Sequence, residues 1–276
     1  MTGRFRRSIA GSLITLLVLC TLGQAQKKTP DVIYVPTDQV VVDEMLRMAD
    51  VSKDDNVYDL GCGDGRLVIT AAKQYGAHGV GIDIDPQRIE ESKANAMKAG
   101  VTDRVKFLEQ DLFQSDFRPA TVVTLYLLTT LNEKLRPILF QQLKPGTPVV
   151  SHDFGMGDWK PDQQKTVKGQ SRDHGVYLWY IPANVAGVWE FKDSDGKPQQ
   201  LAVQQTFQQL DGNLTVNGQA IAKPEMKIQG DELTMVIPGT QKQFTGRVKG
   251  DVIDGTMAGQ KIQMRRAQPA TATIFK

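Results

Sequence analysis

The segment Tyr58–Gly65 places one acid two residues before the first of three glycines at alternate positions. The acid is Asp59, and the glycines are Gly61, Gly63 and Gly65. Residues 66–75, which follow, have a helical pattern. Glycine has no Cβ, so its backbone can lie against a ligand, and the free N–H groups of a helix N-terminus point at the same place. This spacing predicts a binding site for a small polar molecule.

The order of acid and glycines distinguishes between nucleotide ligands. A dinucleotide site has the pattern G-x-G-x-x-G, in which the last glycine allows close packing of helix and strand. This loop is G-x-G-x-G, with Arg66 at that packing position, and no Gly-Lys-Ser/Thr of a Walker loop follows. An acid before the glycines would repel a pyrophosphate but attract an ammonium group. S-adenosylmethionine carries an ammonium, a carboxylate and a sulfonium but no phosphate, so it is the favoured ligand.

Acids also follow the next two predicted strands. Asp83 ends the apolar run that begins at Val80, about twenty residues after the glycines, where a ribose-binding acid is expected. Asp111 follows the third strand and is suited to accept a hydrogen bond from an adenine amino group, and Ile84 is placed to flank the adenine ring. Parallel strands end at one edge of a sheet, so we expect Asp59 to lie near both acids. Asp59 would face the ammonium, while the loop N–H groups take the carboxylate.

Short β-rich runs alternate with helical stretches from about residue 31 to residue 183, which predicts an α/β domain with a mostly parallel sheet. Strands are expected at residues 56–60, 79–83, 105–109, 121–125 and 148–152, and helices at 37–48, 66–75, 86–99 and 131–143. Thr37 is a plausible N-cap, Asp85 precedes Pro86 as a cap, and Thr130 with Glu133 forms a capping-box pattern. Residues 176–181 are expected to add an antiparallel strand at the sheet edge.

The chain changes character after Pro182. Residues 185–267 have many turn signals between short alternating runs, which indicates a small antiparallel β domain, either a barrel or a sandwich. Residues 268–276 are expected to form a flexible tail.

The N-terminus has the pattern of a signal peptide over residues 1–25. Three arginines precede an apolar run at residues 9–22, and Gly23-Gln24-Ala25 resembles a cleavage site. The run is shorter than the ~20 residues of a membrane span. We therefore expect no stable membrane span and an exported protein, periplasmic or in the cell envelope; without a functional signal it would be cytoplasmic.

Composition excludes some classes of function. A formal net charge of +2 provides no basic field for nucleic acid, so no nucleic-acid partner is expected. The three histidines are scattered in the sequence and one of the two cysteines lies in the N-terminal apolar run, so no metal site is expected. The fourth predicted strand is not followed by an Asn-Pro-Pro-Tyr sequence, which disfavours amino methylation of DNA bases.

The residues Asp59–Gly65, Asp83 and Asp111 resemble the nucleoside-binding motifs of class I S-adenosylmethionine-dependent methyltransferases. The resemblance implies a Rossmann-like, doubly wound, mostly parallel seven-stranded sheet over residues 31–183. A narrower similarity, to protein-lysine methyltransferases that include the ATP synthase c-subunit enzymes, rests on the segments Tyr34–Thr37, Val122–Leu128 and Pro145–Phe154. It implies N-methylation of a lysine in a protein substrate.

Three side chains are candidates for the catalytic side of the site: Tyr126, Tyr34 and His152. The ring of Tyr126 after the fourth strand suits an amine, in part through a cation–π contact, and His152 is a possible proton acceptor. Two alternatives to lysine methylation remain open. One is a methyltransferase for an envelope lipid or small molecule, and the other is a nucleoside-binding module without catalysis.

Overall fold

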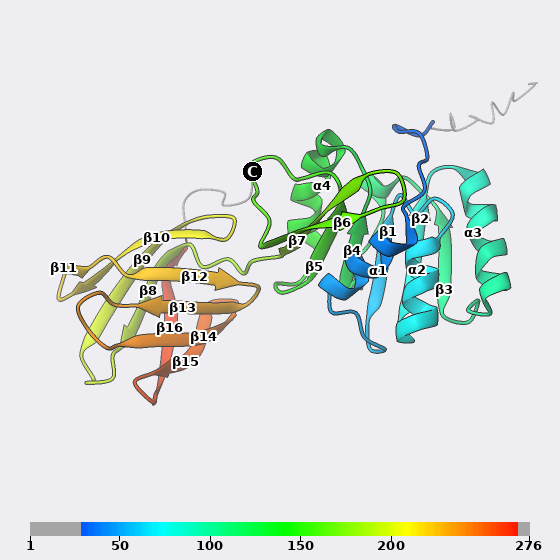
Figure 1. Ribbon diagram of the computed structural model, residues 1–276. Helices are drawn as coiled ribbons and strands as arrows, with labels where there is room; N and C mark the ends of the chain where they lie inside the picture. The colour runs from blue at the N-terminus through cyan, green and yellow to red at the C-terminus, as the bar shows by residue number, and fades with distance from the viewer. Residues whose placement is uncertain (1–28, 270–276) are drawn as a thin grey trace, which may run out of the picture.

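A computed structural model describes residues 29–269 as two β-sheets with helices around the first (Figure 1). The predicted signal peptide and the last seven residues of the expected tail lie outside the described residues. Helices are described at α1 (Gln39–Met48), α2 (Arg66–Thr70), α3 (Pro86–Ala99) and α4 (Thr129–Gln142), with a π-helical turn η1 (Ala71–Tyr75) and a 3₁₀ turn η2 (Leu112–Gln114). In the described range, no helix is both long enough and apolar enough to cross a membrane.

The first sheet has seven strands in the order β3-β2-β1-β4-β5-β7-β6. Their bounds are β1 (Asn56–Leu60), β2 (His78–Asp83), β3 (Val105–Glu109), β4 (Val122–Leu125), β5 (Pro148–His152), β6 (Gln163–Lys168) and β7 (Asp173–Tyr180). Strands β1 to β5 pair in parallel, and β7 is antiparallel to both of its neighbours. The order reverses between β1 and β4, and this switch point is where open α/β sheets bind ligands. The expected mostly parallel seven-stranded sheet is therefore confirmed.

The last two strands in the order of this sheet, β7 and β6, differ from the prediction. The late antiparallel strand exists as β7, but it lies inside the sheet, because β6 pairs along its outer side. The sequence pattern does not reveal β6, since Val167 is its only buried residue and the others face solvent. Edge strands of this polar kind, here with Lys165 and Lys168, resist pairing with other chains.

Two of the three predicted helix caps are wrong. Helix α1 has Asp38 at its N-cap without a side-chain hydrogen bond, and helix α4 has Leu128 there, so neither Thr37 nor the Thr130 box caps a helix. Asp85 does cap α3, because its Oδ1 accepts a hydrogen bond from the N–H of Gln87 at 2.9 Å. The hydroxyl of Thr37 instead meets the ring of His152.

The second sheet has nine strands, and all of its neighbours pair antiparallel in the order β11-β10-β9-β8-β16-β15-β14-β13-β12. The bounds are β8 (Gly187–Lys192), β9 (Pro198–Thr206), β10 (Gln209–Val216), β11 (Gln219–Ala222), β12 (Glu225–Gln229), β13 (Glu232–Val236), β14 (Gln243–Lys249), β15 (Val252–Met257) and β16 (Gln260–Pro269). The first strand of this sheet, β8, pairs with the last, β16. The meander is therefore a ring of strands, interrupted only between β11 and β12. Its alternate residues bury one apolar core.

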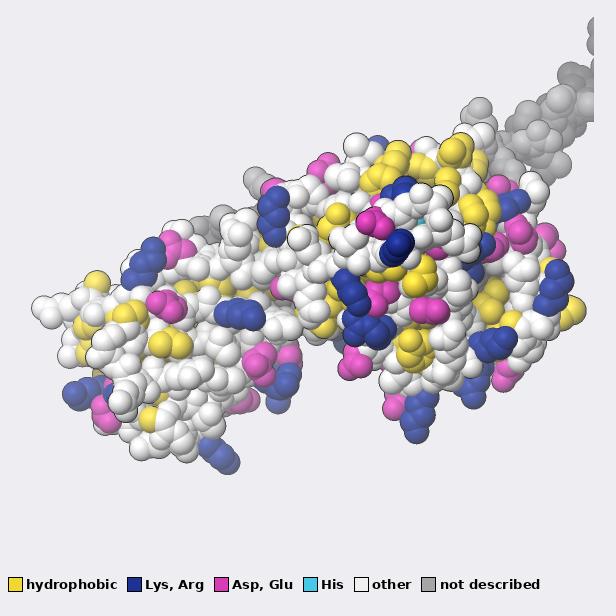
Figure 2. All heavy atoms as spheres, viewed as in Figure 1, with side chains coloured by type: hydrophobic (Ala, Val, Ile, Leu, Met, Phe, Trp, Pro, Cys, Tyr) yellow, Lys and Arg dark blue, Asp and Glu magenta, His cyan; other side chains and the backbone are white. Residues whose placement is uncertain are grey.

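The two sheets share core packing at one joint. Phe207, in the turn after β9, belongs to the hydrophobic cluster of the first unit and stacks near Phe140 and Trp159. The side chain of Gln208 accepts a hydrogen bond from Trp159 Nε1 at 2.9 Å and donates one to the carbonyl of Lys160 at 2.6 Å. The face shown in Figure 2 carries interspersed basic and acidic side chains over both units.

Candidate active site

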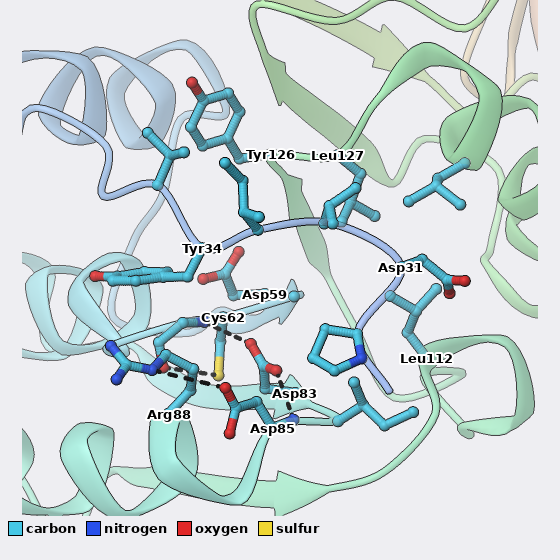
Figure 3. Close-up of a pocket in the computed structure, with 18 of the residues that line it drawn as sticks. Asp31, Tyr34, Asp59, Cys62, Asp83, Asp85, Arg88, Leu112, Tyr126 and Leu127 are labelled. Carbon is cyan, nitrogen blue, oxygen red and sulfur yellow. Dashed lines mark hydrogen bonds and ion pairs between the residues drawn. The ribbon is translucent and has the colours of Figure 1, made fainter. Parts of the chain in front are cut away.

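A cavity of about 780 Å³ opens at the carboxyl ends of β1, β2 and β4, beneath the segment Pro30–Thr37 (Figure 3). Most of the residues predicted from the sequence line it: Tyr34, Asp59, Gly61, Gly63, Asp83, Ile84, Asp111 and Tyr126. Gly65 and His152 are not among the lining residues. Tyr34, a site residue predicted from the sequence, belongs to the segment before α1, and this segment forms one wall.

The glycine loop turns at the end of β1 with positive φ angles at all three glycines. A Cβ on Gly63 would lie 2.3 Å from the ring of Tyr34, so this glycine lets the aromatic ring lie on the loop. A Cβ on Gly65 would lie 2.7 Å from Phe107 and 2.8 Å from Ser92. Gly65 therefore serves the close helix–sheet packing that the dinucleotide pattern would assign to the position of Arg66.

Asp59 is a buried carboxyl group at the floor of the cavity, and the residue is only 3% exposed. Its Oδ1 accepts a hydrogen bond from Thr124 Oγ1 at 2.8 Å. Burial raises the pKa of Asp59 to about 8, and the nearby charges of Asp83 and Asp64 contribute to that rise. An acid in these surroundings gains from a cationic ligand, because a nearby positive charge stabilises its ionised form.

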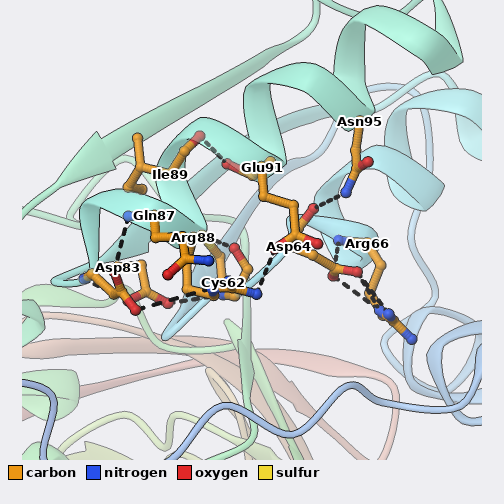
Figure 4. A network of polar contacts seen from close by, with 12 residues as sticks. Cys62, Asp64, Arg66, Asp83, Gln87, Arg88, Ile89, Glu91 and Asn95 are labelled. Atoms are coloured by element: carbon orange, nitrogen blue, oxygen red, sulfur yellow. Dashed lines mark hydrogen bonds and ion pairs between the residues drawn. The ribbon is translucent and has the colours of Figure 1, made fainter.

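Asp83 braces the glycine loop from the end of β2. One carboxylate oxygen accepts from the N–H of Gly63 and the other from the N–H of Asp85, both at 2.9 Å. Burial nevertheless raises the pKa of Asp83. Figure 4 shows this carboxylate beside Cys62, with Asp64 and Arg66 paired further along the loop. The carboxylate thus fixes the loop and also lies on the cavity wall.

Asp111 and Ile84 lie on the cavity wall beyond Asp83. Asp111 Oδ1 accepts a hydrogen bond from the N–H of Phe113 at 3.0 Å and so begins the turn η2. This holds the loop after β3 against the cavity, together with the apolar side chains of Leu112 and Phe113. The adenine end predicted from the sequence therefore has both polar and apolar groups available.

Tyr34 covers the glycine loop from above. The guanidinium of Arg88 lies 4.7 Å from the centroid of its ring. Burial raises the pKa of Tyr34 to about 12, and the charge of Asp64 contributes, so the phenol stays protonated. The neighbouring Ile33 and Val35 are exposed, at 86% and 48%. The mouth of the cavity therefore has an apolar rim.

Tyr126 follows β4 and separates the cavity from His152. The two rings lie 3.8 Å apart between centroids, and His152 is 1% exposed. Its Nδ1 lies 3.1 Å from Thr37 Oγ1 and its Nε2 lies 2.8 Å from Nδ1 of His174. Burial lowers the pKa of His152 to about 4, so the imidazole is neutral at neutral pH.

Two of the histidines that are scattered in the sequence lie together in the fold, and the expectation of no metal site stays a prediction. Pairing of β5 with β7 brings His152 and His174 together with Asp153, and their possible ligand atoms lie within 4.8 Å of one another, a grouping that could hold a metal ion. The guanidinium of Arg172 also bonds to Asp153 Oδ2, which already gives that oxygen a positive partner. Only the strand register places these side chains together, and the sequence alone did not supply it.

The cavity has the chemistry expected for S-adenosylmethionine. Its floor is acidic, with Asp59 close enough to Asp83 and Asp64 for their charges to act on it. The ammonium and sulfonium groups of the ligand are positive, so they match this floor. The absence of Cβ atoms at Gly61 and Gly63 lets the side chain of Leu127 and the ring of Tyr34 lie directly against the loop.

Comparison with known proteins agrees with this chemistry. A family model described as the ANTKMT methyltransferase domain matches residues 59–163. A protein-lysine N-methyltransferase of Saccharolobus islandicus is 50% identical over 153 residues, which are 55% of this chain and 95% of that protein. The lysine N-methyltransferase of Xenopus laevis that is named for the c-subunit of ATP synthase is 30% identical over 156 residues, which are 56% of this chain and 68% of that protein.

A solved structure extends the comparison. It is described as an RNA methyltransferase from Salinibacter ruber in complex with S-adenosyl-L-homocysteine, and it is 57% identical with a TM-score of 0.51. The match covers 55% of this chain and 96% of that one. The family match ends at residue 163 and does not reach the nine-stranded sheet. The chain therefore belongs to the family of S-adenosylmethionine-dependent methyltransferases that includes these lysine N-methyltransferases, and S-adenosylmethionine is its methyl donor.

Proposed function

We propose that this enzyme transfers a methyl group to the side-chain nitrogen of a lysine in a protein. The names of the relatives from Saccharolobus islandicus and Xenopus laevis support a protein lysine as acceptor. The observation that carries most weight is the cavity itself, which joins an acidic floor at Asp59 to an aromatic mouth at Tyr34 and Tyr126. An alkyl amine on an aliphatic stem suits such a mouth.

On the donor side, each cavity residue has a proposed role. Asp59 faces the ammonium group, and the backbone at Gly61 and Gly63 lies beside it, with the N–H groups of the two glycines bonded to the carbonyl of Ile82 and to Asp83. Asp83 accepts hydrogen bonds from the ribose hydroxyls. Asp111 and Ile84 hold the adenine. When bound, S-adenosylmethionine supplies an electrophilic methyl group on a positively charged sulfur.

On the acceptor side, positioning does most of the work. The aromatic rings of Tyr126 and Tyr34 guide the amine into line with the methyl group and exclude water from its path. A lysine amine must arrive without its extra proton, which bulk water can accept before the amine enters. The raised pKa of Tyr126, caused by burial, keeps its phenol neutral, so the ring adds no charge to the channel.

An RNA acceptor is the main rival, because of the description of the Salinibacter ruber structure. RNA binding relies on cations that contact phosphates. The two arginines on the cavity wall are already paired with acids: Arg66 with Asp64 at 2.6 Å, and Arg88 with Glu91 at 2.5 Å. These pairs reduce the positive charge available to phosphates at the mouth. We therefore favour a protein.

The experiment is methyl transfer from labelled donor into an extract of the source cells, with full-length protein. Digestion of the products with protease or nuclease and extraction with organic solvent separate protein, RNA and lipid acceptors. We expect protease-sensitive label that mass spectrometry locates on lysine. The variant Asp83→Ala should lose the label, whereas Asp103→Ala, an exposed residue after α3, should keep it. Label in RNA or lipid would refute the lysine assignment, and donor binding without transfer would support a binding module.

We also propose that the protein is exported, on the basis of the signal-peptide pattern at residues 1–25. Protein purified from cells should then have the mass of a chain that begins near Gln26. A full-length mass in the cytoplasmic fraction would contradict export.

A further inference from the structure

A polar cluster lies behind Tyr126, on the side of the ring away from the donor cavity. We call it the support cluster and define it as Thr37, His152, Asp153 and His174. Its members come from the segment before α1, from the end of β5 and from β7. Figure 3 shows the Tyr126 ring beside the cavity with its hydroxyl directed away from Asp59. The cluster meets this ring through His152, at 3.8 Å between ring centroids.

Both ring nitrogens of His152 have close polar partners. His152 Nε2 lies 2.8 Å from His174 Nδ1 and 3.3 Å from Asp153 Oδ2. His174 Nδ1 in turn lies 3.2 Å from the same Asp153 oxygen, so the two imidazoles and the carboxylate form one group. On the other side of the ring, His152 Nδ1 lies 3.1 Å from Thr37 Oγ1. Both nitrogens of His152 are thus engaged, which fixes its ring plane.

The backbone of Asp153 is unusual. Its φ of 60° lies in the left-handed region, which non-glycine residues adopt rarely. Two hydrogen bonds to Gly175 hold it there, one from the N–H of Asp153 at 2.7 Å and one to its Oδ1 at 2.9 Å. Strained residues of this kind persist where the surrounding structure fixes them, often near functional sites. Here the result is a carboxylate oxygen aimed at the two imidazoles.

A metal ion is a less suitable occupant of the cluster than a proton. Arg172 bonds to the same Asp153 oxygen that would have to bind the metal, and a cation there would be repelled by the guanidinium. A proton in the hydrogen bond between His152 Nε2 and His174 Nδ1 joins the two imidazoles beside Asp153 Oδ2 without that conflict.

We propose that Thr37, Asp153 and His174 are positioning residues for the acceptor, because they fix the ring of His152 and thereby the ring of Tyr126 at the mouth. His152 then acts through Tyr126 and does not exchange protons with the substrate. This inference rests on the proposed transfer to an amine. It assigns a role in methyl transfer to side chains that, apart from Thr37, do not line the donor cavity.

The kinetic test compares Thr37→Val with Thr37→Ser in the full-length enzyme. Valine has nearly the shape of threonine but removes the hydroxyl that contacts His152 Nδ1, whereas serine keeps it. We expect Thr37→Val to lower kcat/KM for the acceptor by about ten- to a hundredfold, with the donor dissociation constant unchanged by calorimetry, and Thr37→Ser to restore most of the rate. Thr215→Val, at an exposed hydroxyl of β10, is the matched control. An unchanged acceptor kcat/KM in Thr37→Val would overturn the proposal, and so would an equal loss of donor binding.

A second measurement needs no acceptor, so it separates failure of this proposal from failure of the proposed function. Nitrogen NMR of labelled histidine should show His152 as a neutral imidazole in a single tautomer, and Thr37→Val or Asp153→Asn should alter that signal together with the ring signals of Tyr126. Stoichiometric zinc in protein purified without chelator, or a mixture of tautomers at His152, would overturn the arrangement. If the NMR signature is present but no amine is methylated, the cluster stands and only the proposed function fails.

Discussion

The two sheets bury different kinds of side chain. In the seven-stranded sheet, polar groups are buried at the strand ends, where Asp59 meets Thr124 and His152 meets Thr37. In the nine-stranded sheet, inward residues such as Trp189, Phe244 and Met264 form an apolar core, and the buried polar side chains Asp193, Gln199 and Gln205 lie in the same unit. Burial of polar groups costs stability, so their presence at one sheet edge marks where the chain serves a ligand. The apolar core of the second sheet serves folding.

The joint between the sheets refines this comparison. Phe207 leaves the nine-stranded sheet and packs beside Trp159 in the first unit. The second sheet therefore adds packing to the catalytic unit at a distance from the cavity. We expect substitutions in the second sheet to change stability without changing donor binding.

The largest expected effect is on stability alone. Phe244 is fully buried in the nine-stranded sheet, so Phe244→Ala removes a large apolar group and leaves a cavity. We expect a loss of about 3–5 kcal/mol in the free energy of unfolding, measured by denaturant titration. Donor affinity measured under conditions where the variant is folded should not change. Val236→Ala, a partly exposed site on the same sheet, is the control. A large change in donor affinity would show that ligand binding by the first sheet is not separate from folding of the second.

A smaller change in free energy is expected at the cavity, and there it should appear in donor affinity. Asp83→Ala removes both the partner of the loop N–H groups and the proposed partner of the ribose. We expect donor binding to weaken by about 1–3 kcal/mol, measured by calorimetry. The exposed Asp103→Ala is the control for loss of one negative charge. Unchanged affinity in Asp83→Ala would rule out the ribose contact.

The raised pKa of Asp59 predicts a pH dependence of donor binding. Its pKa of about 8 in the fold exceeds the ordinary value of 3.8, so the empty protein binds the proton more tightly than the unfolded chain. This contribution to stability is present below pH 3.8 and is lost as the pH rises through 8. A bound ammonium favours the ionised form, so binding below pH 8 releases a proton.

Donor affinity should therefore rise between about pH 5.5 and 7.5, by at most about tenfold or 1.4 kcal/mol per pH unit. Calorimetry in buffers of different ionisation enthalpy counts the protons released. Asp59→Asn should bind the donor more weakly and lose the proton release. Proton release that persists in this variant would assign the effect to another group.

The sequence predicted the parts of the site that follow from local pattern. The strand-end acids Asp59, Asp83 and Asp111 and the glycines Gly61 and Gly63 were predicted for the site and do line the cavity, because each lies where a short apolar run must end. Residue types also predicted the antiparallel meander, since its side chains alternate between core and solvent. A local sequence pattern is enough to predict where a residue lies when a single strand or turn decides its position.

The parts that the sequence did not predict depend on pairing between distant segments. His174 joins His152 only through the register of β7 on β5, and the exposed β6 has no apolar pattern to reveal it. Thr37 had the pattern of a helix cap, but its partner is 115 residues away in the chain. Likewise, Phe207 had no local signal that it packs in the other unit.

The smallest predicted effect is at the joint between the two sheets. Gln208 bonds to the indole N–H of Trp159 and to the exposed carbonyl of Lys160, so Gln208→Ala leaves the partly buried indole N–H without this partner. We expect a loss of about 1 kcal/mol in the free energy of unfolding, against no loss in Gln204→Ala, which is exposed on β9. Fluorescence of Trp159 and circular dichroism of the β-sheets should still give one coincident transition, because Phe207 keeps the cores joined. Two separate transitions in Gln208→Ala would instead show that these hydrogen bonds, and not the apolar contact, couple the sheets.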